Sequence, residues 1–154
     1  MLSVLVDFAN LFLAALLAGA MFAVWLVFNP AGVSANSYVL LQQQAIRTLN
    51  TAMPALGAAT VVVTTVAAAL ARRDGTRLGL LMAAVLCFAA AGLITRFQNQ
   101  PINALVITWS SDAPPSDWTI LRDAWWRWHI LRLAAGLGGH SLVIAAVLRR
   151  AWAG

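Results

Sequence analysis

The chain has 154 residues, of which 62% are hydrophobic and only 10% are charged, and its formal net charge is +5. This apolar share exceeds the roughly 45–50% of ordinary soluble domains, which excludes a soluble enzyme and predicts a bilayer partner. All ten cationic residues are arginines that flank or end apolar segments, and no basic run or binding motif points to nucleic acid. The single cysteine, Cys87, lies inside an apolar run, which argues against a disulfide framework or a thiolate metal site.

We expect an all-α fold: one integral membrane domain over residues 1–154, built as a four-helix bundle with spans near 3–28, 37–71, 78–97 and 118–149. The first span is interrupted only by Asp7 and Asn10 and ends before Pro30. Its apolar core is longer than the roughly 7–15 residues of a secretory signal peptide, so we interpret it as a retained helix.

The first third of the second span is polar. Gln43, Arg47, Asn50 and Pro54 recur there at helical spacing and predict one stripe on the helix. Pro54 is expected to kink the helix and to free a backbone carbonyl.

The third span contains small residues that permit close helix approach. Pro101 follows it, so we expect the helix to stop and residues 98–103 to form a loop at the membrane surface. Asn99 and Asn103 would then either cap a turn or form a hydrogen-bonding rim.

The fourth helix, long and partly extramembrane, carries the strongest pattern. An arginine facing lipid costs roughly 2.5–3.5 kcal/mol, so an arginine-bearing face must point into the bundle or into an aqueous mouth. Spacings of four and three place seven residues on one such face: Trp118, Arg122, Trp125, His129, Arg132, Gly136 and His140.

The arginines divide equally between the two ends of the bundle. Those at the end with both termini lie in free loops and helix ends, whereas the others form the patterned cluster. We therefore expect both termini in the cytoplasm, a bacterial plasma membrane as the location, and the cluster facing outward.

The sequence resembles the anthrone-oxygenase-like family of small four-helix membrane proteins, most of which have no known function. The resemblance spans the chain, and its specific part runs from Asn99 to Arg132 through the pattern W-x3-R-x2-W-x3-H-x2-R. The matching residues are Asn99, Pro101, Ile102, Asn103, Trp109, Trp118, Arg122, Trp125, His129 and Arg132. It implies oxidation of an anthrone to an anthraquinone without an obvious cofactor, although family membership implies the fold more strongly than the reaction.

An anthrone has an acidic C–H group, and the anion left after its deprotonation can reduce dioxygen without a metal. We expect His129 to act as the base, because a histidine side chain ordinarily titrates near pH 6.5, with Arg122 and Arg132 stabilising the oxyanion. The expected substrate-binding residues are Asn99, Asn103, Trp109, Trp118, Trp125, Arg47 and Arg96.

The residues alone leave open whether the chain is an enzyme. His129 and His140 are separated by about 16 Å along one helix and cannot share a metal ion, so we predict no metal. No cofactor is predicted either, although haem and quinone stay open. The alternatives are a lipophile- or quinone-binding protein and an accessory subunit of a larger membrane complex or homo-oligomer.

Overall fold

The computed structural model describes residues 1–152, with side chains through Arg150. It contains α1 (Leu2–Val27), α2 (Ala35–Leu70), α3 (Gly75–Ile94), the π-helical turn η1 (Thr95–Asn99), α4 (Gln100–Val106) and α5 (Trp118–Trp152). Because η1 and α4 continue α3, the described residues form four long helical rods, each apolar and long enough to cross a membrane. The predicted all-α, four-helix membrane architecture is confirmed.

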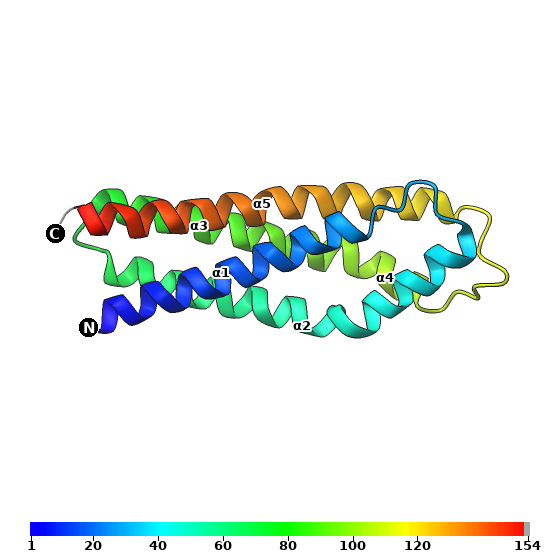
Figure 1. The fold of residues 1–154 in the computed structure, drawn as a ribbon, viewed down its shortest axis with the longest axis horizontal. Helices are drawn as coiled ribbons and strands as arrows, with labels where there is room; N and C mark the ends of the chain where they lie inside the picture. Colours follow the sequence, from blue (N-terminus) through cyan, green and yellow to red (C-terminus); the bar gives the residue numbers. More distant parts are fainter. Residues whose placement is uncertain (153–154) are drawn as a thin grey trace.

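The four rods run antiparallel to their sequence neighbours in an elongated bundle (Figure 1). Both described ends and the α2–α3 turn lie at one end, and the segment between α4 and α5 lies at the other. Helices α3 and α5 approach closely because Gly139 has no side chain: a Cβ atom there would lie 2.7 Å from the Phe88 ring.

At the end of the bundle that holds both described ends of the chain, buried charged side chains join the helices. Asp7 of α1 is buried and pairs with Arg77 of α3, and its other oxygen accepts a hydrogen bond from Arg150 of α5 at 2.6 Å. One carboxylate thus joins three helices. Ion pairing of this kind compensates the desolvation of charged groups that lie inside an apolar bundle.

Side-chain caps explain where two of the helices begin. The Ser34 hydroxyl accepts a hydrogen bond from the Ser37 amide at α2, and the Asp74 carboxylate accepts one from the Arg77 amide at α3. Helix α5 has 35 residues, so it is about 52 Å long and exceeds the roughly 30 Å apolar core of a bilayer. Part of α5 therefore extends outside the apolar layer.

The loop predicted at residues 98–103 is wrong. The chain stays helical to Val106, because η1 adds one residue to the turn before Pro101: the Gln100 amide donates to the Thr95 carbonyl, five residues earlier. Pro101 then lies in the first turn of α4, a position that proline favours. A π-helical turn of this kind is frequent at functional sites.

Helix α2 stays helical through Pro54 and changes direction partway along its length (Figure 1). A proline inside a helix removes one hydrogen bond and clashes with the preceding turn, which bends the helix. The bend has a direct consequence for the interior, because Met53 and Pro54 line both cavities described below.

Candidate functional site

An apolar cavity of about 410 Å³ lies beside the bend of α2. This volume falls within the range of small-molecule sites in proteins. Its walls come mainly from apolar residues of three helices, including Leu17, Met21, Met53, Gly57, Val61, Phe88 and Ala91. Polar groups are confined to the end farther from the termini, where Thr95, Arg96, Gln100 and Arg132 contribute. The cavity therefore suits a flat apolar molecule with one polar edge.

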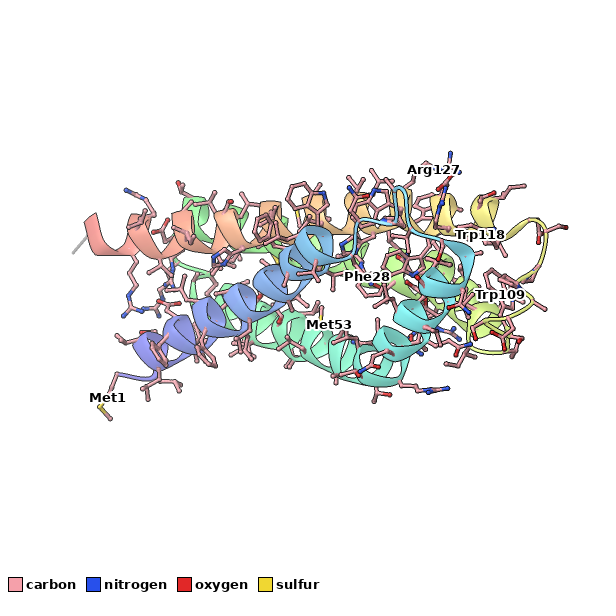
Figure 2. All side chains as sticks on the ribbon, turned by 45° about the vertical axis from the view of Figure 1, so that its right-hand side comes forward. Met1, Phe28, Met53, Trp109, Trp118 and Arg127 are labelled. Carbon is pink, nitrogen blue, oxygen red and sulfur yellow. The ribbon has the colours of Figure 1, made fainter. Side chains whose placement is uncertain are left out.

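The cavity reaches the outer surface of the bundle between α2 and α3. Ala58 and Val62 of α2 and Gly92 of α3 line it and are also exposed. Both helices belong to candidate membrane spans. Figure 2 shows Met53 on α2 between Met1 at one end and Trp109 and Trp118 at the other.

Arg132 provides the positive charge at the polar end. It lies about 27 Å along α5 from Arg150. Its guanidinium lies 3.4 Å from the Thr95 hydroxyl and 5.9 Å from the centre of the Trp125 ring. No carboxylate among the described residues forms a salt bridge with it. The cation is therefore available to stabilise negative charge on a ligand.

His129 lies behind Arg132 and lines neither cavity. Its exposed fraction is 0%, and its ring stacks on Trp125 and on Trp126 with centroid distances of 5.3 and 5.5 Å. Nδ1 lies 2.9 and 3.3 Å from two guanidinium nitrogens of Arg132. Arginine has only donors, so Nδ1 must accept and the ring proton must reside on Nε2. The buried Nε2 has no hydrogen-bond partner among the described residues.

A second, smaller chamber of about 40 Å³ lies next to the apolar cavity. The two spaces share four wall residues: Met53, Pro54, Thr95 and Arg132. The remaining walls of the chamber include the side chains of a hydrogen-bond network centred on Asn103. Asn103 Oδ1 accepts from Trp125 Nε1 at 2.9 Å and from Gln42 Nε2 at 3.3 Å, and its Nδ2 donates to Asn50 Oδ1 at 3.0 Å.

Several residues expected at the site lie elsewhere. Arg122 is about 15 Å along α5 from Arg132; it pairs with Asp123 and lies 4.9 Å from the Trp118 ring centre. Trp118 in turn packs against the buried Tyr38. Neither Arg122 nor Trp118 lines a cavity, so the structure does not bring them together with Arg132.

The other expected residues divide between structural positions and the cavities. Asn99 is buried and donates to the Trp125 carbonyl, which ties η1 to α5. Trp109 accepts a hydrogen bond from Gln43 at its carbonyl and packs in the cluster around Val106. Arg47 is exposed and lines neither space, whereas the exposed Arg96 borders the apolar cavity.

Thr95, Gln42 and Met53 are site residues that sequence reasoning missed. Gln42 carried a signal, because it shares a helix face with Ile46 and Asn50 at spacings of four. Thr95 and Met53 are ordinary residues for a membrane helix and gave no signal. Among residues 1–152, no three His, Cys, Asp or Glu side chains lie close enough together to hold a metal ion.

A family model described as anthrone oxygenase matches residues 43–142, which is more than half of the chain. The matched range contains the bend of α2, all of η1 and α4, and Arg132. Neither the curated proteins nor the solved structures compared with the chain gave a match.

Proposed function

The chain belongs to the anthrone oxygenase family, and we propose that it oxidises a lipophilic anthrone-like compound with dioxygen inside the apolar cavity. Three features support the proposal: the family, a cavity of about 410 Å³ that takes a flat ring system, and Arg132 at its polar end. The observation that carries it is Arg132, a largely enclosed cation at the end of an apolar cavity that has no carboxylate partner among the described residues.

The proposed reaction balances without a metal. A proton leaves the methylene carbon of the anthrone to water, which gives an enolate with its charge on the ring oxygen. The enolate transfers electrons to dioxygen and a carbon–oxygen bond forms at the former methylene carbon. The peroxide anion takes the proton back from hydronium, and the resulting hydroperoxide loses water as its O–O bond and the second C–H bond break. One anthrone and one dioxygen thus yield one anthraquinone and one water.

Arg132 would act as the catalytic residue of this reaction, by stabilising the enolate oxygen. A positive charge held in a water-poor site stabilises a developing anion far more than the same charge does in water. The guanidinium is held from three sides, by the His129 nitrogen, the Thr95 hydroxyl and the face of Trp125. Such a group needs little reorganisation when the anion forms.

His129 acts as a positioning residue in this proposal. Its Nδ1 orients the guanidinium, and two tryptophan rings fix the plane of the imidazole. The base role expected from the sequence finds no support in the geometry, because His129 lines neither cavity and Arg132 already engages Nδ1. Water is therefore the proton acceptor in the scheme.

The orientation of the chain is also a proposal. We infer that both termini are cytoplasmic, because Arg72 and Arg73 lie exposed in the short turn between α2 and α3 and Arg149 lies exposed near the end of α5. The polar end of the cavity would then lie near the outer boundary of the apolar layer, and the substrate would arrive from the lipid between α2 and α3.

The test uses the purified protein in mild detergent with anthrone and dissolved dioxygen. Wild-type protein should consume dioxygen and form anthraquinone in equal amounts, faster than spontaneous oxidation in the same detergent. Arg132→Gln should lower kcat/KM by about 10²–10³-fold, whereas Arg127→Gln, at an exposed position of the same helix, should leave it unchanged. Tight binding of the quinone without turnover by the wild type would instead favour a lipophile-binding protein.

A further inference from the structure

Two of the four methionines of the chain line the apolar cavity. Met21 of α1 is 3% exposed, and Met53 lies beside Pro54 at the bend of α2 (Figure 2). The other two line neither cavity: Met82 is 45% exposed and Met1 is 98% exposed. The chain therefore has thioether groups in the cavity wall and others at the surface with which they can be compared.

The thioether of Met21 lies on the apolar side of Arg132. A Cβ atom at Gly136 would be 3.2 Å from Met21 Sδ, so the sulfur packs against a glycine. Gly136 follows Arg132 by about 6 Å along α5, toward the end of the bundle that holds the termini. Met53 packs against the buried cluster that contains Met21 and Phe88, so its side chain also turns inward.

The proposed reaction forms a hydroperoxide in this part of the cavity. The carbon that binds dioxygen lies opposite the oxygen-bearing carbon in the central six-membered ring of the anthrone. When that oxygen is held at Arg132, the peroxide therefore points away from Arg132 and toward the apolar walls. Among the described residues of these walls, only Met21 and Met53 have side chains that a hydroperoxide oxidises readily.

We propose that Met21 and Met53 are oxidation sites, at which the hydroperoxide formed in the cavity converts the thioether to a sulfoxide. This inference rests on the proposed function. The distal peroxide oxygen bonds to sulfur as the O–O bond breaks, and the hydroperoxide proton moves to the oxygen that stays on the ring carbon. Sulfur loses two electrons and the peroxide gains them, so each event yields one sulfoxide and one hydroxyanthrone in place of the quinone.

The sulfoxide limits the activity of the cavity in which it forms. It places a polar oxygen in a wall that is otherwise apolar, next to the rings of the ligand. A flat apolar molecule then binds less tightly, so the KM for anthrone rises as sulfoxide accumulates. The number of turnovers per protein molecule is therefore set by how often the hydroperoxide oxidises a methionine before it loses water.

The experiment exposes the wild-type protein in mild detergent to cumene hydroperoxide and locates the sulfoxides by peptide mass spectrometry. This probe is apolar and aromatic, and it requires neither anthrone nor dioxygen. Met21 and Met53 should be oxidised about tenfold faster than Met82, because binding in the cavity holds the peroxide beside them. Excess anthraquinone should occupy the cavity and remove this difference. Hydrogen peroxide, which is polar, should oxidise the exposed Met82 before the buried Met21.

A second measurement connects the sulfoxides with the proposed reaction. During oxidation of anthrone with ¹⁸O₂, the sulfoxides at Met21 and Met53 should contain ¹⁸O. A variant that combines Met21→Leu and Met53→Leu should keep a larger fraction of its own initial rate over repeated turnovers than the wild type, since leucine has a similar volume but no sulfur. Met82→Leu is the matched control and should decline as the wild type does.

Two results would overturn the inference: oxidation of Met82 by cumene hydroperoxide as fast as that of both cavity methionines, or sustained anthrone turnover without labelled sulfoxide at either position. The second result would leave the oxygenase proposal standing. Preferential oxidation of Met21 and Met53 by cumene hydroperoxide in a protein that does not oxidise anthrone would contradict the oxygenase proposal instead. The sulfoxide positions are measured in the wild type, so the test does not depend on the folding of a variant.

Discussion

Arg132 directs two guanidinium nitrogens at a single nitrogen of His129, at 2.9 and 3.3 Å, from one helical turn further along α5. The pairing turns a histidine that the sequence suggests as a base into the acceptor that holds an arginine in place. Because both side chains come from α5, their relation does not depend on how the other helices pack. The third guanidinium nitrogen contacts Thr95 of η1, so the π-helical turn completes the setting of the cation.

The two roles considered for His129, positioning residue and general base, predict different activities for variants at this position. If His129 positions Arg132, His129→Gln should keep much of the activity, because its amide oxygen can still accept from the guanidinium. His129→Leu removes the acceptor and should lower kcat about 10- to 100-fold, since a small displacement of the cation weakens its action on the oxyanion. Steady-state kinetics on both variants separate the roles. If His129 were instead the general base, kcat should fall about 10²–10⁴-fold in both variants.

The lateral opening predicts that bulk between α2 and α3 hinders the substrate. A Cβ atom at Gly92 would meet no other atom within 4 Å, so Gly92→Leu can extend into the opening without disturbing the backbone. We expect a raised KM for anthrone with an unchanged melting temperature. Gly79→Leu is the matched control, because Gly79 lies in the same helix, is equally open, and is remote from the cavity. An effect of the same size at both positions would argue against lateral access.

The Asp7 network predicts a stability effect separate from activity. Asp7→Asn leaves the buried Arg77 without its counter-charge, and breaking a buried pair in this way costs ~3–5 kcal/mol. Reversible unfolding in mixed micelles would measure the loss. The exposed pair of Arg122 and Asp123 provides the comparison: Asp123→Asn should change the unfolding free energy by less than about 1 kcal/mol. A small loss in Asp7→Asn would mean that lipid headgroups or water replace the carboxylate.

Asn103 predicts both a stability and a spectroscopic effect. Asn103→Leu deprives the Trp125 indole and the Gln42 amide of their shared acceptor, and each unsatisfied buried donor costs about 1–3 kcal/mol. The emission of Trp125 should shift, since its N–H loses a partner, and this can be read in a variant whose other tryptophans are phenylalanine. Unchanged emission would contradict the hydrogen bond between Trp125 and Asn103.

The bundle itself follows from hydropathy, because four long apolar segments separated by polar turns leave few other folds. The details that place the site depend on packing. Pro101 predicts a break in the helix. The helix continues because the π-helical turn η1 accommodates the proline, and no local sequence signal predicts such a turn. On α2 most of the expected stripe faces the interior: Asn50 and Pro54 line the smaller chamber. Gln43 binds the carbonyls of Val106 and Trp109, and only Arg47 is exposed.

The residues of the candidate site could be identified from sequence only where the residue type is costly in a membrane. Arg132 and Asn103 stood out for that reason, and the structure brings both to cavities. Arg122 stood out equally and lies elsewhere, since an arginine at the end of a span can reach water and an aspartate. No pattern in the sequence predicted the apolar cavity. The residues that line it are of the same types as ordinary lipid-facing residues, and only the packing of the helices makes them enclose a cavity.

The most direct test of the central claim is to supply anthrone and ¹⁸O₂ to the purified protein and to its Arg132→Gln variant, and to follow the quinone by mass spectrometry. An oxygenase that uses Arg132 should place one ¹⁸O atom in each anthraquinone, with the labelled product forming about 10²–10³-fold faster in the wild type. Equal rates in the two proteins, or an unlabelled quinone, would contradict dioxygen chemistry assisted by Arg132.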